Sequence, residues 1–406
     1  MDNLFSSFDL TNFPTVDKEK RKDKIIKATK AFNKMIKDSR SQAKQSTCYY
    51  CKKDCDSFCN SHTLPAFCLR NIAQNGKVFY SNTILALPLL KDNKGVNEAG
   101  TFHLICRDCD SKIFQDYENP DNYEDIPSIK MLAQIDMKNN LKNISKRLME
   151  IEMYDIMRKR IGVRKELSQA KKDVSDLDLN EFKAAYVRAK KRSLKPFSGD
   201  YHIGYYTKLP YVVPVAFQGT IALIFDLEGN VVNNVYNPDP KYKVMNMSLC
   251  IFPLKNTSIV MIFVAKDNNR YRQFFKQLKK LNSLDDQLNV INYILFSYSE
   301  DYFLSATLPQ NVLKELGALS AKTPDLLPLT PPSIEERLEA AKEIFDFRGR
   351  QKELGALSAK TPNLLALTPP SIEERLETAK EIFNFRGRQN IPNLLSNQFA
   401  LEPSLH

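Results

Sequence analysis

The chain has 406 residues, 43% of them hydrophobic, and its 59 basic and 48 acidic side chains give a formal net charge of +11. This apolar content excludes a wholly disordered chain, and no apolar run approaches the roughly 18 residues that a membrane span needs. The first residues show no basic-then-apolar signal pattern, so we expect a cytoplasmic protein with no membrane partner.

The positive charge is concentrated in two stretches of the chain. Residues 1–44 hold 11 basic and 6 acidic side chains, and residues 142–195 hold 16 and 8. The segment between them, residues 45–141, holds 10 basic and 12 acidic side chains. Basic stretches are either solvated helix faces or surfaces that contact phosphate. The module between them favours the second interpretation, so we expect nucleic acid as a partner.

The first basic stretch is predicted to be helical. Ile25, Phe32 and Ile36 recur at helical spacing among its lysines and arginines, which predicts a helix over residues 17–44. We therefore assign residues 1–45 to a basic helical arm.

Cysteines dominate the next segment, residues 46–126. Two CxxC pairs, Cys48/Cys51 and Cys106/Cys109, are suited to one tetrahedral zinc, because thiolates are its natural ligands. A disulfide framework is the alternative, and the lack of an export signal argues against it. Three further cysteines in this segment, Cys55, Cys59 and Cys68, could form a second cluster with Cys51 and His62. Their spacing matches no established metal-site pattern, so we expect them to be free and half-buried.

The order of elements around the cysteine pairs predicts a treble-clef arrangement. A first CxxC pair is followed by a hairpin and by a strand-like stretch at residues 101–105. The second pair then begins a helix predicted over residues 110–117, with Ile113, Phe114 and Tyr117 on one side.

Two motifs in this segment carry a family resemblance. Ser61-His62-Thr63-Leu64-Pro65 follows the first cysteine pair, with Phe67 two residues later, and Cys106 to Glu118 forms a CxxC-acidic stretch ending in Tyr-Glu. Residues 46–126 thereby resemble the His-Me finger (HNH) nucleases that carry a four-cysteine zinc site. They also resemble bacterial proteins of unsettled function that share both motifs. The resemblance covers about a fifth of the chain.

The resemblance implies a metal-dependent endonuclease that hydrolyses phosphodiester bonds of nucleic acid. His62 would be the general base, and Mg²⁺ or Mn²⁺ would stabilise the leaving oxygen. Asp110 would hold this cation, and Arg70 and Lys112 would contact phosphate. The family usually has an acidic residue or a second histidine at the position of Ser61, Asn at that of Thr101, and His or Asn at that of Asp110.

Glu118 is a second acidic candidate for the catalytic cation. On one continuous helix, the eight residues between Asp110 and Glu118 correspond to about 12 Å. We therefore expect that these two carboxylates do not share one ion.

Residues 127–195 are predicted to form a basic helical segment. Apolar residues recur at helical spacing from 129 to 160; they include Leu132, Ile135, Leu141, Ile144, Leu148 and Ile151.

Residues 196–312 form an α+β domain to which the sequence assigns no chemistry. A hairpin is predicted over residues 221–226 and 231–236, followed by strands at 247–252 and 259–264. Helices are predicted at 271–281 and 284–296.

The last segment, residues 313–406, contains two 38-residue repeats. Lys314–Gln351 and Lys352–Gln389 align without gaps and differ at four positions. Ser333 and Glu336 in the first copy, and Ser371 and Glu374 in the second, form an S-x-x-E capping box that predicts the start of a helix.

Together these features predict an α+β protein. Its treble-clef, or ββα-metal, zinc module is flanked by basic helices and followed by a second α+β domain and a duplicated helical tail. The favoured function is an HNH-like endonuclease with a structural zinc. Two alternatives remain: a non-catalytic zinc module that binds nucleic acid, and an interaction scaffold that binds protein through residues 196–406.

Overall fold

The computed structural model describes residues 30–31, 34–84, 87–161, 165–235, 237, 239, 241–299, 301–309, 311–313, 315, 371–373, 376 and 392–402. Within the predicted helix over residues 17–44, the described residues 30–31 and 34–42 are helical. The duplicated tail lies outside the described residues apart from 315, 371–373 and 376.

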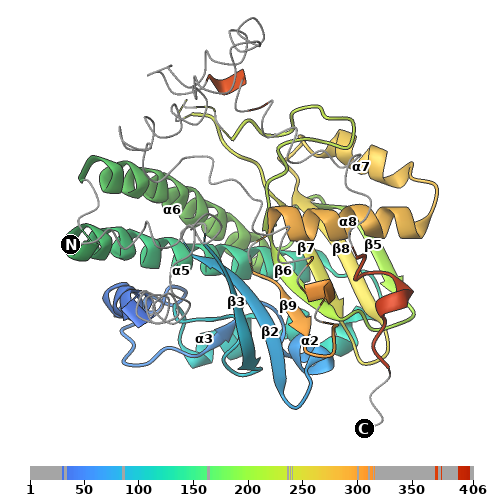
Figure 1. Cartoon of the computed structure of the whole chain (residues 1–406), viewed down its shortest axis with the longest axis horizontal. Coiled ribbons are helices and arrows are strands. Elements are labelled where there is room, and N and C mark those ends of the chain that lie inside the picture. The colour runs from blue at the N-terminus through green and yellow to red at the C-terminus, as the bar shows by residue number, and fades with distance from the viewer. Residues whose placement is uncertain are drawn as a thin grey trace, which may run out of the picture.

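The protein has a mixed α and β architecture built on one sheet of seven strands (Figure 1). All neighbouring strands in it are antiparallel, in the order β3-β2-β9-β6-β7-β8-β5. The strands are β2 (Lys77–Ile84), β3 (Leu87–Gly95), β5 (Tyr201–Leu209), β6 (Val215–Ile221), β7 (Met247–Pro253), β8 (Ser258–Ala265) and β9 (Phe303–Ser305).

The central strands are covered on both faces. Cys250 and Phe252 of β7 face a core that includes α2 (Ala66–Ile72) and α5 (Ile129–Ile161). Leu249 and Ile251 alternate to the other face, where α7 (Arg272–Lys279) and α8 (Leu284–Tyr298) pack. Burial on both faces explains why β7 and β8 are continuous apolar runs, and their predicted positions, like those of α7 and α8, are confirmed.

The helix α5 is the central element of the molecule. It runs beside α6 (Lys165–Leu194), with which it forms a long helical pair (Figure 1). Almost every side chain from residue 131 to 141 is buried, so this part of α5 is covered on all sides rather than on one apolar stripe. The helix predicted over residues 129–160 is confirmed, but its first half is a core element.

The sheet extends across the boundary predicted between the cysteine segment and the α+β domain. Strands β2 and β3 come from residues 46–126, and β2 pairs with β9, in which Phe303 lies opposite Tyr80. The remaining elements near the cysteines are short: β1 (Ser61–His62), β4 (Thr101–Phe102), α3 (Arg107–Ile113), α4 (Gln115–Glu118) and the 3₁₀ turn at Pro120–Tyr123.

The predicted hairpin after β6 forms a loop instead of two strands. Only one bridge, between Phe225 and Val231, joins its arms. The Asp226 carboxylate accepts hydrogen bonds from the backbone amides of Glu228 and Asn230, and this side chain supports the turn beside a few backbone bonds between the arms. Gly229 supplies the positive φ of the turn, at 84°.

Among the described residues, no helix is both long and apolar enough to cross a membrane.

Candidate metal centre and the histidine beside it

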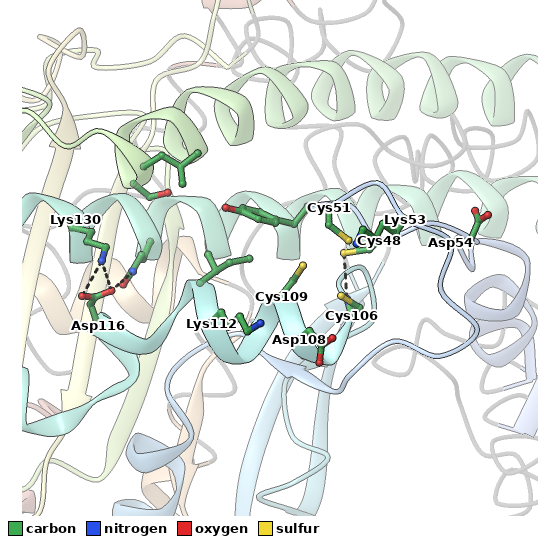
Figure 2. A pocket seen from close by; sticks show the side chains of 15 residues that line it. Cys48, Cys51, Lys53, Asp54, Cys106, Asp108, Cys109, Lys112, Asp116 and Lys130 are labelled. Carbon is green, nitrogen blue, oxygen red and sulfur yellow. Dashed lines mark hydrogen bonds and ion pairs between the residues drawn. The ribbon is translucent and has the colours of Figure 1, made fainter.

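The four cysteines of the two CxxC pairs come together. Their sulfur atoms all lie within 4.8 Å of one another, and this is the one such group of His, Cys, Asp or Glu in the described part of the chain. Figure 2 shows two of these side chains rising from a loop and two from the start of α3. Four sulfurs bound tetrahedrally to one zinc at about 2.3 Å would lie about 3.8 Å apart, so the cluster is the right size for one metal ion.

The loop that carries the first pair is a tight knuckle. The Cys48 amide donates to the Lys53 carbonyl at 2.9 Å, and the Lys52 amide donates back to the Cys48 carbonyl at the same distance. Lys52 adopts a positive φ of 64° to close this turn. The Cys106 amide then donates to Cys48 Sγ at 3.4 Å, which joins the knuckle to the first residue of the second pair.

The short helix α3 depends on this cluster. It has seven residues, and none of them is buried. A helix this short is unstable alone, because its nucleation cost exceeds what its few hydrogen bonds return. The cysteines at its start and the bonds of Asp110 to Ser61 and Lys138 attach it to the rest of the protein.

The electrostatics of the cluster favour a cation. Burial would raise the pKa of the Cys48 thiol, but hydrogen bonds from the Cys106, Cys51 and Tyr50 amides lower it to about 7. Burial and the neighbouring sulfurs raise the pKa of Cys109 instead. Four thiolates at this separation need a positive ion between them, which is how cysteine metal sites are neutralised.

The other three cysteines of this segment lie outside the four-sulfur group, and no described cysteine forms a disulfide. Cys55 donates to the Ser57 carbonyl at 2.7 Å. Cys59 is half-buried and hydrogen-bonds the Asp110 carboxylate, and burial raises the pKa of its thiol to about 12. Cys68 is fully buried in the core, near Cys250 from β7. We predicted that Cys68 is half-buried, whereas the structure shows that it is fully buried.

His62 lies on the two-residue strand β1, which pairs with β4. Its Nε2 is 3.0 Å from the Val96 carbonyl, and because a carbonyl only accepts, Nε2 carries the proton. In the neutral ring, Nδ1 is then the free acceptor. Burial, followed by the nearby Lys138 charge, lowers the pKa of His62 against the opposing effects of Val96, Glu118 and Asp110. The imidazole is therefore neutral at neutral pH.

The predicted cation ligand Asp110 is already occupied by protein groups. Its Oδ1 accepts from Ser61 Oγ at 2.6 Å and from Lys138 Nζ at 2.9 Å. Burial alone would raise the pKa of Asp110, but the Lys138 ammonium and the Ser61 hydroxyl lower it overall.

Glu118 lies closer to Asp110 than one continuous helix over the eight intervening residues would place it. Glu118 Oε1 is 3.0 Å from the same Lys138 Nζ. The helix predicted over residues 110–117 is interrupted at Phe114, where φ is −104° and ψ is 7°. This break turns α4 relative to α3, so both carboxylates reach one ammonium.

The two predicted phosphate contacts lie in different places. Arg70 is exposed on α2 and shares a surface hollow of about 640 Å³ with Val96, the residue that holds His62. Lys112 is exposed on α3 and lines a hollow of about 660 Å³ with the four cysteines (Figure 2). Arg70 therefore lies near Val96, the residue bonded to His62, and Lys112 lies near the four cysteines.

A third cavity, of about 450 Å³, gathers basic side chains that the sequence placed far apart. Arg40 and Lys44 come from the first basic stretch, Lys142 and Lys146 from the second, and Lys94 from β3. Three acidic residues share the cavity: Asp56, Glu98 and Asp301. Of these, Asp301 pairs with Lys142 at 2.8 Å.

Three of these cations have no acidic partner among the residues that the structure describes. Within the described part of the chain, no carboxylate lies within ion-pair distance of Arg40, Lys44 or Lys94. Burial and then the Arg40 charge lower the pKa of Lys94, and burial, Arg40 and Lys44 lower the pKa of His103. Some basic residues of α5 and α6 pair with acidic residues of the same two helices; Arg147 pairs with Asp178 and Lys172 with Asp155.

Sequence reasoning missed Lys138, although the sequence contained a signal for it. Lys138 lies three residues after Ile135 and three before Leu141, on the apolar stripe that predicted the helix. A lysine on such a stripe is expected to find a carboxylate, because a buried ammonium without a partner is costly.

Comparison with known proteins gave no match: no family model, no curated protein and no solved structure matches this chain.

Proposed function

We propose that this protein binds nucleic acid through phosphate contacts on a platform held together by a structural zinc. The observation that carries the proposal is the cavity lined by Arg40, Lys44, Lys94, Lys142 and Lys146. The two basic stretches of the sequence converge on it, and three of its cations lack an acidic partner among the described residues. Phosphate is the anion that such a site would take, because it neutralises several cations at once.

Zinc is the metal that fits the cysteine cluster best. Four cysteine sulfurs, with one backbone amide donating to Cys48, form a closed thiolate site of the kind that structural zinc occupies. A knuckle, a β1–β4 ribbon and a helix that begins with the second cysteine pair support a treble-clef assignment. Zinc content per chain, measured by mass spectrometry of the purified protein, is expected to be one in the wild type and lower in Cys48→Ser and Cys106→Ser.

Binding is tested by fluorescence anisotropy with labelled DNA and RNA over a range of salt concentrations. The triple variant Arg40→Ala/Lys44→Ala/Lys94→Ala is expected to bind more weakly, with a salt slope reduced by about 1 for each phosphate that the variant no longer neutralises. The matched control is Lys276→Ala/Lys279→Ala/Lys280→Ala. It removes three exposed charges at and just after α7, on the other face of the sheet. Equal weakening in both variants would show that overall charge, and not this cavity, accounts for binding.

Phosphodiester hydrolysis is a second candidate function, favoured by the setting of His62. The Val96 carbonyl fixes Nε2–H and leaves Nδ1 as the acceptor, which is the state a general base needs. Arg70 lines a hollow together with Val96, the residue that accepts from His62, which supports Arg70 as the proposed phosphate contact.

The cleavage assay uses supercoiled plasmid and RNA in Mg²⁺, in Mn²⁺ and in EDTA. His62→Ala is expected to abolish cleavage, while His202→Ala, at an exposed histidine on β5, is expected to retain it. Cleavage that survives in His62→Ala would exclude His62 as the base. An inactive wild type that still binds nucleic acid would leave binding as the function.

A further inference from the structure

The Lys138 ammonium lies where the carboxylates of the predicted catalytic site meet. Lys138 is 0% exposed, and its Nζ is 2.9 Å from Asp110 Oδ1 and 3.0 Å from Glu118 Oε1. The Phe114 ring covers it from another side, with Nζ 3.9 Å from the ring centroid. The ammonium thus has two anionic partners and one aromatic face, and no contact with solvent.

This arrangement compensates for the burial of a charge. Removing an ammonium from water is costly unless it is paired and hydrogen-bonded. Here two carboxylates accept from it, and Asp110 also accepts from the Ser61 hydroxyl and the Cys59 thiol. These partners come from four separate elements or loops, so the ammonium ties α3 and α4 to the central helix α5.

The same two carboxylates do not fit a catalytic divalent cation. Mg²⁺ requires oxygen ligands at about 2.0–2.1 Å in octahedral geometry. Asp110 Oδ1 already serves Ser61 and Lys138, and Glu118 Oε1 serves Lys138. A divalent ion between them would lie against a buried ammonium, and the low-dielectric surroundings would strengthen that repulsion. The cation position implied by the family resemblance is filled by a side chain of the protein itself.

We propose that Lys138 is the resident cation of this site. Its ammonium takes the place of a divalent ion between Asp110 and Glu118, and it makes the site independent of Mg²⁺ and Mn²⁺. Removal of the ammonium leaves two carboxylates without a counter-charge around a cavity and creates a divalent-cation site. Lys138 is a positioning residue, because no substrate reaches a side chain that is fully buried.

Mn²⁺ binding by the full-length, zinc-loaded protein tests the proposal without nucleic acid, so its outcome is independent of the proposed function. Electron paramagnetic resonance would count bound Mn²⁺, and thermal unfolding would report its effect on stability. The variant Lys138→Met is expected to bind Mn²⁺ at least tenfold more tightly than the wild type, with an unfolding temperature that rises as Mn²⁺ is added. In the neutral variant Lys138→Met/Asp110→Asn/Glu118→Gln, both effects are expected to disappear.

The wild type provides a test that does not depend on the folding of Lys138→Met. Wild-type protein, Glu118→Gln and the control Asp121→Asn, an exposed acidic residue just after α4, are expected to show the same Mn²⁺ binding. Wild-type binding of Mn²⁺ that is absent in Glu118→Gln and kept in Asp121→Asn would overturn the proposal. A Lys138→Met protein that folds and gains no Mn²⁺ affinity would overturn it as well.

Discussion

Tyr80 and Phe303 stack face to face, with ring centroids 4.7 Å apart and planes inclined by 10°. They lie directly opposite one another on β2 and β9, although they are far apart in the sequence. Through this pair, the cysteine segment and the end of the α+β domain share one core. The backbone of Gly100 closes over the Phe303 ring from the loop before β4.

A side chain at position 100 is expected to disrupt this packing. A Cβ on Gly100 would lie 2.3 Å from Phe303 Cζ and 2.9 Å from Thr63 Oγ1, and the backbone φ there is 64°. Overpacking and a left-handed backbone together predict that Gly100→Ala lowers the free energy of unfolding by about 2 kcal/mol or more. Urea denaturation measures this loss.

Gly95→Ala is the control for Gly100→Ala, because a Cβ at Gly95 would meet nothing within 4 Å. Its free energy of unfolding is expected to stay within about 0.5 kcal/mol of the wild type. Equal losses in the two variants would contradict the packing explanation.

The buried carboxylate Asp301 is predicted to depend on Lys142. The pair is 2.8 Å apart, and the side chains are 9% and 12% exposed respectively. Burial alone would raise the pKa of Asp301, but Lys142, Lys146 and the Tyr80 hydroxyl lower it overall. The Lys142→Met variant is expected to lose about 3–5 kcal/mol of stability, because it leaves a buried charge with a partner missing.

The double variant Lys142→Met/Asp301→Asn is expected to regain most of that loss, since the neutral amide needs no counter-charge. Chemical denaturation of the wild type, the two single variants and the double variant measures the coupling free energy between Lys142 and Asp301. Additive losses would indicate that the ion pair contributes nothing specific.

Metal removal is predicted to unfold the region of α3 and leave the central sheet intact. No residue of α3 is buried, whereas every residue of β7 is. Metal binding supplies folding free energy to such a helix. When a chelator removes the metal, the backbone amides of α3 and of the β1–β4 pair are expected to lose protection from hydrogen exchange first. Cys55→Ser, outside the cluster, should behave as the wild type does. Unchanged protection of α3 without metal would refute this prediction.

Burial of neutral His62 predicts that stability falls in mild acid. The pKa of His62 is lower in the folded protein than its ordinary value of about 6.5, so the unfolded chain binds the proton more tightly. The stability gained from keeping His62 neutral is complete above about pH 6.5. It is lost as the pH falls toward the pKa of His62 in the folded protein. Lys138, Glu118 and Asp110 are the charged groups that act on the ring.

The measurement is the free energy of unfolding of wild type and His62→Gln between pH 8 and pH 5, in excess zinc. The difference between the two proteins is expected to change in this range, with the wild type losing more stability as the pH falls. A constant difference would mean that His62 does not titrate differently in the folded and unfolded states.

Local patterns in the sequence predicted much of the fold. The apolar runs of β7 and β8 and the periodic helices α5, α7 and α8 have signals within the segment that forms them. The metal cluster was predictable for the same reason, since CxxC spacing brings two sulfurs to one point whatever surrounds them.

Long-range relationships were not predictable in this way. The pairing of β2 with β9 depends on tertiary packing, and no residue of either strand encodes its partner. The two carboxylates meet because the helix breaks at Phe114, a residue that is usually compatible with a continuous helix. Convergence of Arg40, Lys94 and Lys142 on one cavity likewise requires the whole fold.

The triad of Lys138, Asp110 and Glu118 constrains how this protein can change during evolution. Loss of the lysine alone leaves two half-buried carboxylates without their shared counter-charge, and loss of one carboxylate weakens the neutralisation of the ammonium. The three positions are therefore expected to covary among relatives. A lineage with an apolar residue at 138 should either have neutral residues at 110 and 118, or retain both acids and require a divalent ion. The residue at position 138 on α5 would then separate relatives that need a divalent ion between these two acids from relatives that do not.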